Sequence, residues 1–278
     1  MPFCDVIAPL VASKTLGYVA GLAMAMGAYS LLAIGKEYTR FAETGSMPSQ
    51  LHAALSLVLG CLLVFRTNTA YNRWWEARTL WGMLVNASRN TAIKLHHIAC
   101  IPDDELGRAR SLLVAFPVAL KHHLRGESVQ LPESVKKLSG SAVHVPQALI
   151  NQLYEIVGRA KRSGAIDGND LRVLDVELTR FLDVCGGCER IQRTRIVTSY
   201  RTFARQCILL VLLTLPWGVA HDFGWWTLPL TIIVSYFMIG LETVAEHVEE
   251  PFGYDEDDLD LDEICLTIES SVNEILCT

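Results

Sequence analysis

The sequence predicts an all-α protein that crosses a membrane, and three observations support this fold class. Of its 278 residues, 51% are hydrophobic and only 19% are charged, whereas soluble domains carry about 25% charged residues. Four strongly apolar stretches contain no Asp, Glu, Lys or Arg, and they lie in pairs toward the two ends of the chain. The region between the pairs follows the 3.6-residue period of helices and shows no alternation typical of strands.

Composition also excludes several classes of protein. The high apolar content excludes a disordered chain. Eight cysteines in 278 residues are too few for a disulfide scaffold. The net charge of −6 argues against a nucleic-acid binder, so we expect no nucleic-acid partner.

The first pair of charge-free stretches predicts transmembrane helices over about 15–35 and 48–65. A helix needs about 20 mostly apolar residues to cross a bilayer. The first stretch satisfies this length, and the second does so if its helix begins near Pro48. The first is too long for a signal peptide and lacks a small-residue cleavage pattern after it, so we expect it to be retained.

The second pair predicts helices over about 201–221 and 223–241. The charge-free part of the first of these is short, so the span must include Arg201 and Arg205, whose long side chains can reach the interface. Four spans per chain result, and the protein is expected to be a multi-pass integral membrane protein.

The distribution of positive charge predicts the topology. Of the 24 Lys and Arg residues, 21 lie within 66–205. Positive residues near span ends favour the cytoplasmic side, so 66–200 is predicted to be cytosolic and both termini to share that side. We expect the cell (plasma or inner) membrane, with a thylakoid or other organellar membrane as the alternative.

Helix signals divide the cytosolic region. Pro102 and Asp103 begin one helix that ends at Gly126, and Pro132 and Pro146 begin two more. Two sets of apolar residues each share one helical face. The sets are Leu149, Leu153, Ile156, Val157 and Ala160, and Leu171, Leu174, Leu178, Phe181 and Leu182.

The segment 246–278 is acidic at its start. From Glu246 to Glu263 there are ten Asp or Glu residues and no Lys or Arg. One interpretation is a solvated exit from the membrane. The other is a site for a hard cation such as calcium at the carboxylates of 255–258, although the spacing is not that of an EF-hand.

Little in the sequence suggests catalysis. The pair Cys185 and Cys188 has metal or redox spacing, but zinc needs a second pair or nearby histidines. The pairs 96–97 and 122–123 are adjacent histidines, which point to different sides of a helix. The two glycines between the cysteines favour close packing. We therefore predict no catalytic residue, no metal site at these cysteines and no cofactor. The rival interpretation is a membrane-bound enzyme that uses a metal or redox chemistry at Cys185 and Cys188.

The segment that follows the second span is the most unusual. Residues 65–82 read FRTNTAYNRWWEARTLWG, and Trp beside Arg is typical of a membrane boundary. Before it, Leu57, Cys61 and Phe65 stand four residues apart and stack along one side of a helix. Several copies around an axis turn this stripe into apolar rings that gate ions by dewetting. Helix–helix packing explains the spacing equally well.

Three blocks of sequence resemble the bestrophin family, in its prokaryotic and chloroplast branch. They are FRTNTAYNRWWEARTLWG at 65–82, CERIQRTRIVTSY at 188–200 and ETVAEHVEEPFGYDEDDLDLDEI at 242–264. Their order and the spans between them also match, so the resemblance covers nearly the whole chain. The motif after the second span comprises Arg66, Asn68, Arg73, Trp74, Trp75 and Glu76.

The resemblance implies a homopentameric ion channel with one central pore that passes chloride or other small anions. It implies a hydrophobic neck whose three rings are Leu57, Cys61 and Phe65. Animal members have bulky residues at all three rings, so the smaller Cys61 predicts a wider or less hydrophobic neck. A cation-permeable channel of the same fold and a non-conducting membrane interaction protein are the alternatives.

The resemblance also bears on calcium. Animal members bind calcium after the last span, and the acidic positions of that clasp correspond to Asp255 and Asp258. Two further positions, amide side chains in animal members, correspond to His247 and Glu250. Because of these two departures, we expect channel activity to depend little on calcium.

Overall fold

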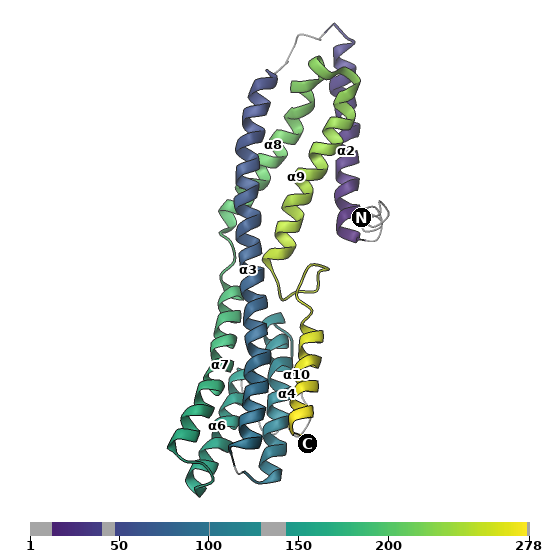
Figure 1. The fold of residues 1–278 in the computed structure, drawn as a ribbon. Coiled ribbons are helices and arrows are strands. Elements are labelled where there is room, and N and C mark those ends of the chain that lie inside the picture. Colours follow the sequence, from purple (N-terminus) through teal and green to yellow (C-terminus); the bar gives the residue numbers. More distant parts are fainter. Residues whose placement is uncertain (1–12, 41–47, 100, 129–142, 277–278) are drawn as a thin grey trace. The chain divides into compact units, whose positions relative to one another are not determined.

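The computed structural model describes residues 13–40, 48–99, 101–128 and 143–276, and within them it is helical without a strand (Figure 1). The all-α prediction is therefore confirmed for the described part. In chain order the elements are α2 (Lys14–Glu37), α3 (Ser49–His97), α4 (Asp103–Arg125), α6 (Val145–Ser163), α7 (Gly168–Arg193), α8 (Thr198–Phe223), the short 3₁₀ helix η1 (Gly224–Trp226), α9 (Thr227–Glu249) and α10 (Leu261–Leu276).

The chain forms two compact units. The membrane unit contains the chain up to Arg73, Arg195–Glu249 and Asp255–Asp257, and the helical unit contains Trp74–Thr194, Glu250–Tyr254 and the chain from Asp258 onward. Helix α3 belongs to both, because its 49 residues continue without interruption past the predicted end at Phe65.

Three helical stretches are long and apolar enough to cross a membrane: Lys14–Glu37, Gln50–His97 and Thr198–Glu249. The third stretch consists of α8 and α9, which are joined by η1 and pack side by side. Gly224, with φ of +51°, begins this connection in a conformation that suits glycine. Helix α2 packs against both (Figure 1). Four crossings per chain require α8 and α9 to cross separately.

Glycines allow the helices of the membrane unit to approach closely. A Cβ atom on Gly27 of α2 would lie 2.4 Å from Cγ1 of Ile232 in α9. One on Gly218 of α8 would lie 2.4 Å from Nδ1 of His52 in α3. Small residues at such contacts are typical of helices that pack within a bilayer.

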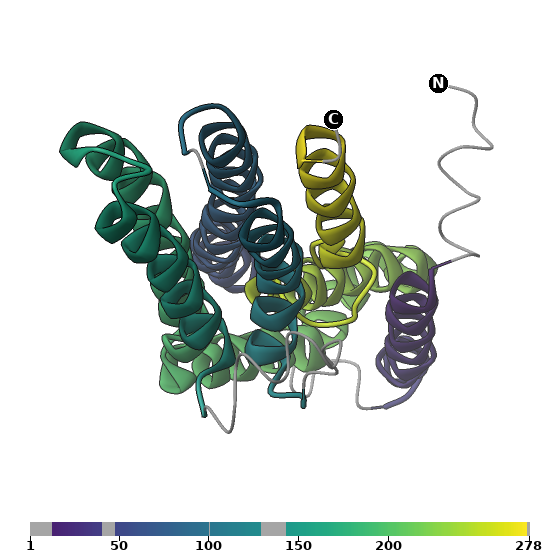
Figure 2. The ribbon, with the colours of Figure 1, turned by 90° about the horizontal axis from the view of Figure 1, so that it is seen from below.

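In the helical unit, α4 packs against α6, α7 and α10 (Figure 2). Its predicted bounds are confirmed: it begins at Asp103, and Gly126 ends it with φ of +69°. Pro146 lies in the first turn of α6 as predicted. The predicted start at Pro132 lies outside the described residues. The core that these helices share with α3 includes Trp81, Phe116, Leu153, Phe181 and Ile268.

The two predicted apolar faces, on α6 and α7, differ in how completely they are buried. All five members of the α6 face are buried. On α7, Leu174, Leu178 and Phe181 are buried and Leu171 is half-buried, whereas Leu182 is 38% exposed, so this face is not buried throughout. The buried face of α7 instead continues through Cys185 and Cys188, because these positions follow Phe181 at helical spacing.

Packing accounts for the glycines between those cysteines. A Cβ atom on Gly187 would lie 2.8 Å from Cδ1 of Leu80 in α3, whereas one on Gly186 meets nothing within 4 Å. Burial raises the pKa of Cys185 to about 12 and raises that of Cys188 further. Both thiols are therefore protonated at neutral pH, which disfavours a reactive pair.

Candidate functional site

The three residues of the predicted neck lie on an exposed side of α3. Leu57 is 72% exposed, Phe65 is 67% exposed, and Cys61 between them is also exposed. The opposite side of the helix is buried, since Leu59 and Leu63 pack against α8. Within one chain, the Leu57–Cys61–Phe65 face is thus free for a pore, a neighbouring copy or lipid.

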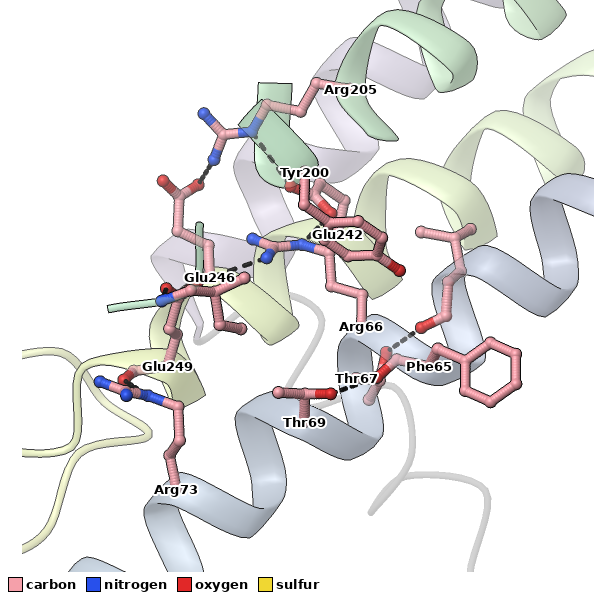
Figure 3. A network of polar contacts seen from close by, with 12 residues as sticks. Phe65, Arg66, Thr67, Thr69, Arg73, Tyr200, Arg205, Glu242, Glu246 and Glu249 are labelled. Carbon is pink, nitrogen blue, oxygen red and sulfur yellow. Dashed lines mark hydrogen bonds and ion pairs between the residues drawn. The ribbon is translucent and has the colours of Figure 1, made fainter. Parts of the chain in front are cut away.

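This exposed stripe continues along α3 at Asn68 and Asn72. The stripe therefore changes from apolar to polar directly after Phe65. Two threonines on the same stretch bond back to their own helix: Thr67 donates to the Leu63 carbonyl at 2.9 Å and Thr69 to the Phe65 carbonyl at 2.8 Å (Figure 3). Their hydroxyls are satisfied locally and need no partner from another helix.

Arg66 points away from the stripe and is completely buried. Its Nε donates to Oε2 of Glu242 at 2.6 Å, and its Nη1 donates to Oε2 of Glu249 at 3.3 Å (Figure 3). Both glutamates belong to α9 and are themselves buried. One guanidinium therefore joins α3 to two turns of α9.

Glu242 is shared with a second arginine. Its Oε1 accepts from Nε of Arg205 in α8 at 3.0 Å. Arg205 in turn reaches Glu246, with Nη2 2.6 Å from Oε2 (Figure 3). Glu242 thereby connects α3, α8 and α9 through its two oxygens, and Arg205 does more than reach the interface.

Glu249 forms the other junction. Its Oε1 accepts from the backbone N–H of Ile196 at 3.1 Å, and its carbonyl accepts from Nε of Arg73 at 3.2 Å. Nearby, the hydroxyl of Tyr200 donates to the Leu62 carbonyl of α3 at 3.2 Å. These bonds hold the segment before α8 and the first turn of α8 against the rest of the membrane unit (Figure 3).

The arginine–glutamate network is electrically balanced. Its members are Arg66, Arg73, Arg205, Glu242, Glu246 and Glu249, which carry three positive and three negative charges. Burying charges costs free energy unless they are paired and hydrogen-bonded. Because its charges cancel, the network positions α3 without imposing a net charge on its surroundings.

The other motif residues do not converge on this network. Asn68 and Trp75 are exposed, whereas Trp74 packs against the core of the helical unit. Glu76 is bonded to Arg190 of α7. Helical periodicity separates them, because Arg66 and Arg73 face inward while Asn68 and Trp75 face outward.

The predicted cation site stays a prediction, because its two residues belong to different units. Asp255 is exposed and belongs to the membrane unit, whereas Asp258 is half-buried and belongs to the helical unit. In the helical unit, Nε and Nη2 of Arg125 each donate at 3.0 Å, to the carbonyls of Phe252 and Gly253. A guanidinium thus already binds two carbonyls of the turn that follows α9.

Sequence reasoning missed the glutamate partners of Arg66. Glu242 and Glu249 stand seven residues apart, at the end of a charge-free stretch, so they lie on one face of a helix. That spacing was the available signal. It could not identify Arg66 as the partner, because 176 residues separate Arg66 from Glu242.

A family model described as bacterial/fungal bestrophin protein matches residues 3–274. A protein from Nostoc sp., named as a voltage-dependent anion channel-forming protein, is 35% identical over 79% of this chain and 75% of its own length. Relatives with the same name from Synechocystis sp. and Escherichia coli (strain K12) are 33% and 31% identical, over 83% and 77% of this chain and 78% and 72% of their own.

Solved structures agree with these relatives. A bacterial bestrophin homologue from Klebsiella pneumoniae superposes with a TM-score of 0.86 at 27% identity, over 95% of this chain and 99% of its own. A second structure of that homologue, in another variant form, gives a TM-score of 0.88 at 24% identity, over 96% and 99%.

Proposed function

Because the chain belongs to the bacterial and fungal bestrophin family and is an anion channel, we propose that five copies surround one central pore with α3 lining the neck. The observation that carries this proposal is the exposed face Leu57–Cys61–Phe65 on a helix whose opposite side is packed. Family and relatives point to a channel rather than an enzyme. The proposed location is the cell membrane.

In this arrangement each neck residue forms a ring of five side chains. A closed five-fold ring brings the same face of every copy to the axis. Apolar rings resist wetting, so ions pass only when the neck widens or hydrates. The middle ring is Cys61, whose side chain is smaller than those of Leu57 and Phe65, so the neck is widest there.

The sign of the permeant ion is tested by a reversal potential in a planar bilayer under a KCl gradient. A value near the chloride equilibrium potential is the expected result. A value near the potassium equilibrium potential would contradict anion selectivity and favour the cation channel of the same fold. Purified, correctly assembled protein that carries no current would favour the non-conducting interaction protein.

The neck is tested through Cys61. A charged, water-soluble thiol reagent is expected to reduce anion flux in the wild type, because Cys61 is exposed on the proposed pore face. The Cys61→Ser variant is the control and should conduct without responding to the reagent. Equal inhibition of Cys61→Ser would place the reactive thiol elsewhere, and a Cys61 that stays unlabelled in an active channel would remove it from the pore.

We further propose that conduction needs no calcium. Arg125 binds the Phe252 and Gly253 carbonyls, so two oxygens of the turn already have a positively charged partner. Addition of a calcium chelator to both sides of the bilayer should leave the current unchanged. A current that disappears with the chelator and returns with calcium would show that Asp255 and Asp258 serve a clasp.

A further inference from the structure

Two histidines and one glutamate converge in the helical unit. His123 lies near the C-terminal end of α4, His144 directly precedes α6, and Glu189 lies on α7. The Nε2 atoms of His123 and His144 lie 2.8 Å and 2.6 Å from the same atom, Oε1 of Glu189. The three side chains are 24%, 31% and 19% exposed, so an ion from solvent can reach them.

We propose that His123, His144 and Glu189 bind a zinc ion. Three nitrogen and oxygen donors from three helical elements lie within 4.8 Å of one another. Two imidazoles and a carboxylate are a ligand set that zinc prefers, with the fourth position left to water. The site is separate from the proposed neck and does not rest on the proposed function.

The present distances fit this role after a small movement. Zinc–ligand distances of about 2.0–2.2 Å place neighbouring donor atoms roughly 3.3 Å apart. The two nitrogen–oxygen distances are shorter because they are hydrogen bonds, so each ring must withdraw by about half an ångström. The centroids of the two rings are 4.5 Å apart. Both rings are partly exposed, so few neighbouring atoms oppose such a shift.

Two further side chains, Arg193 and Cys185, contact the carboxylate of Glu189, whose Oε1 faces the histidines. The neighbouring charged group is Arg193, whose Nη2 is 3.9 Å from the other oxygen, Oε2. The oxygen that faces the histidines, Oε1, also accepts a weak hydrogen bond from the thiol of Cys185, whose Sγ is 3.8 Å away, and the proposed ion would replace this contact.

The tautomer of His144 adds a constraint. Its Nδ1 accepts a hydrogen bond from the backbone N–H of Gln147 at 3.2 Å and so caps α6. In the neutral ring the proton is then on Nε2, the atom that faces Glu189. Zinc binding at Nε2 moves that proton to Nδ1, so the ion replaces the cap as the link between His144 and the helix bundle.

Calorimetric titration of zinc into chelator-treated, full-length protein in detergent tests the site, with excess magnesium present to occupy exposed carboxylates. One zinc per chain at micromolar affinity or tighter is expected. Glu189→Gln should weaken binding at least tenfold. His144→Asn should do the same, and it removes the imidazole while keeping a good helix cap.

His122→Asn is the matched control. His122 is adjacent to His123 but its Nδ1 faces Glu127 at 2.8 Å, so this variant should bind zinc like the wild type. Wild-type affinity no greater than that of His144→Asn and Glu189→Gln would overturn the proposal. Cobalt provides a readout that is independent of variants: the intense visible absorption of four-coordinate Co²⁺ supports the site, and the weak spectrum of six-coordinate Co²⁺ overturns it.

Discussion

Arg66 is a charged residue that links two helices of the membrane unit, α3 and α9. It is completely buried, yet two glutamates of α9 accept its hydrogen bonds. An unpaired charge in such a place would cost several kcal/mol. The pairing explains why a charged residue can directly follow Phe65, an exposed apolar residue, while pointing to the other side of the helix.

Replacement of Arg66 by alanine is expected to lower the free energy of unfolding by about 3–5 kcal/mol, because it leaves Glu242 and Glu249 buried without that partner. Arg205→Ala is the control. Arg205 is 43% exposed, so its loss should cost about 1 kcal/mol or less. Unfolding in mixed detergent–SDS micelles measures both. Similar losses in the two variants would contradict a dominant role for the buried pair.

For single residues, the sequence predicts which side chains share a helix face better than it predicts which residues they contact. The spacing of Leu57, Cys61 and Phe65 correctly places them on one side of a helix, and the structure finds that side exposed. Which surface covers this side stays a prediction, as does the cation role of Asp255 and Asp258. The convergence of His123, His144 and Glu189 could not be predicted, because it depends on how three helices pack.

Among the elements, α7 depends on a glycine for its packing. Gly187→Ala should destabilise the protein by about 1–3 kcal/mol, since the new methyl group would lie 2.8 Å from Leu80 and force the core to adjust. Gly186→Ala is the matched control and should stabilise α7 by about 0.5–1 kcal/mol, as for any open helix position. Urea unfolding monitored by circular dichroism distinguishes them. A stabilising Gly187→Ala would contradict the packing explanation of the two glycines.

The same helix begins with a capping box. The Asp167 side chain accepts from the N–H groups of Asp170 and Asn169, and these backbone hydrogen bonds lower the pKa of Asp167. A lowered pKa in the folded state means that the contribution to stability is present above the ordinary carboxyl pKa and is lost as pH falls through the lowered value.

Asp167→Ala should therefore lower the thermal midpoint at neutral pH, and the difference from wild type should shrink in acid. Asp167→Asn keeps a good cap without a titrating group, so its midpoint should stay near that of the wild type at neutral pH. Differential scanning calorimetry of the three proteins, from neutral pH down to below the ordinary carboxyl pKa, provides the measurement. A difference between Asp167→Ala and wild type that does not change with pH would show that the carboxylate charge is irrelevant.

Local signals predict helix ends well where they are strong. The residues Pro102, Asp103 and Gly126 correctly bound α4, since proline, acidic residues and glycine each favour one end of a helix. The continuation of α3 to His97 was not predicted. The helix continues because no glycine or proline breaks it where its apolar part ends. Helix α10 was also missed, although Leu261, Cys265, Ile268 and Val272 form its buried face.

For the whole molecule, the proposed pore requires a pentamer. Native mass spectrometry in detergent should give five times the 30.8-kDa mass of the chain. A closed five-fold ring brings this face of every copy to the same axis. A stable monomer, or an open series of masses, would contradict the proposed pore.

The pairing of Arg66 with Glu242 also has a consequence for biosynthesis. After Arg66 the ribosome adds 176 residues to reach Glu242, which takes roughly 10–35 s at about 5–20 residues per second. During that interval the second helix has left the ribosome and its arginine still lacks the α9 carboxylates. The ion pairs between α3 and α9 can therefore form only near the end of translation. A chain that stalls before α9 should be a substrate for membrane quality control.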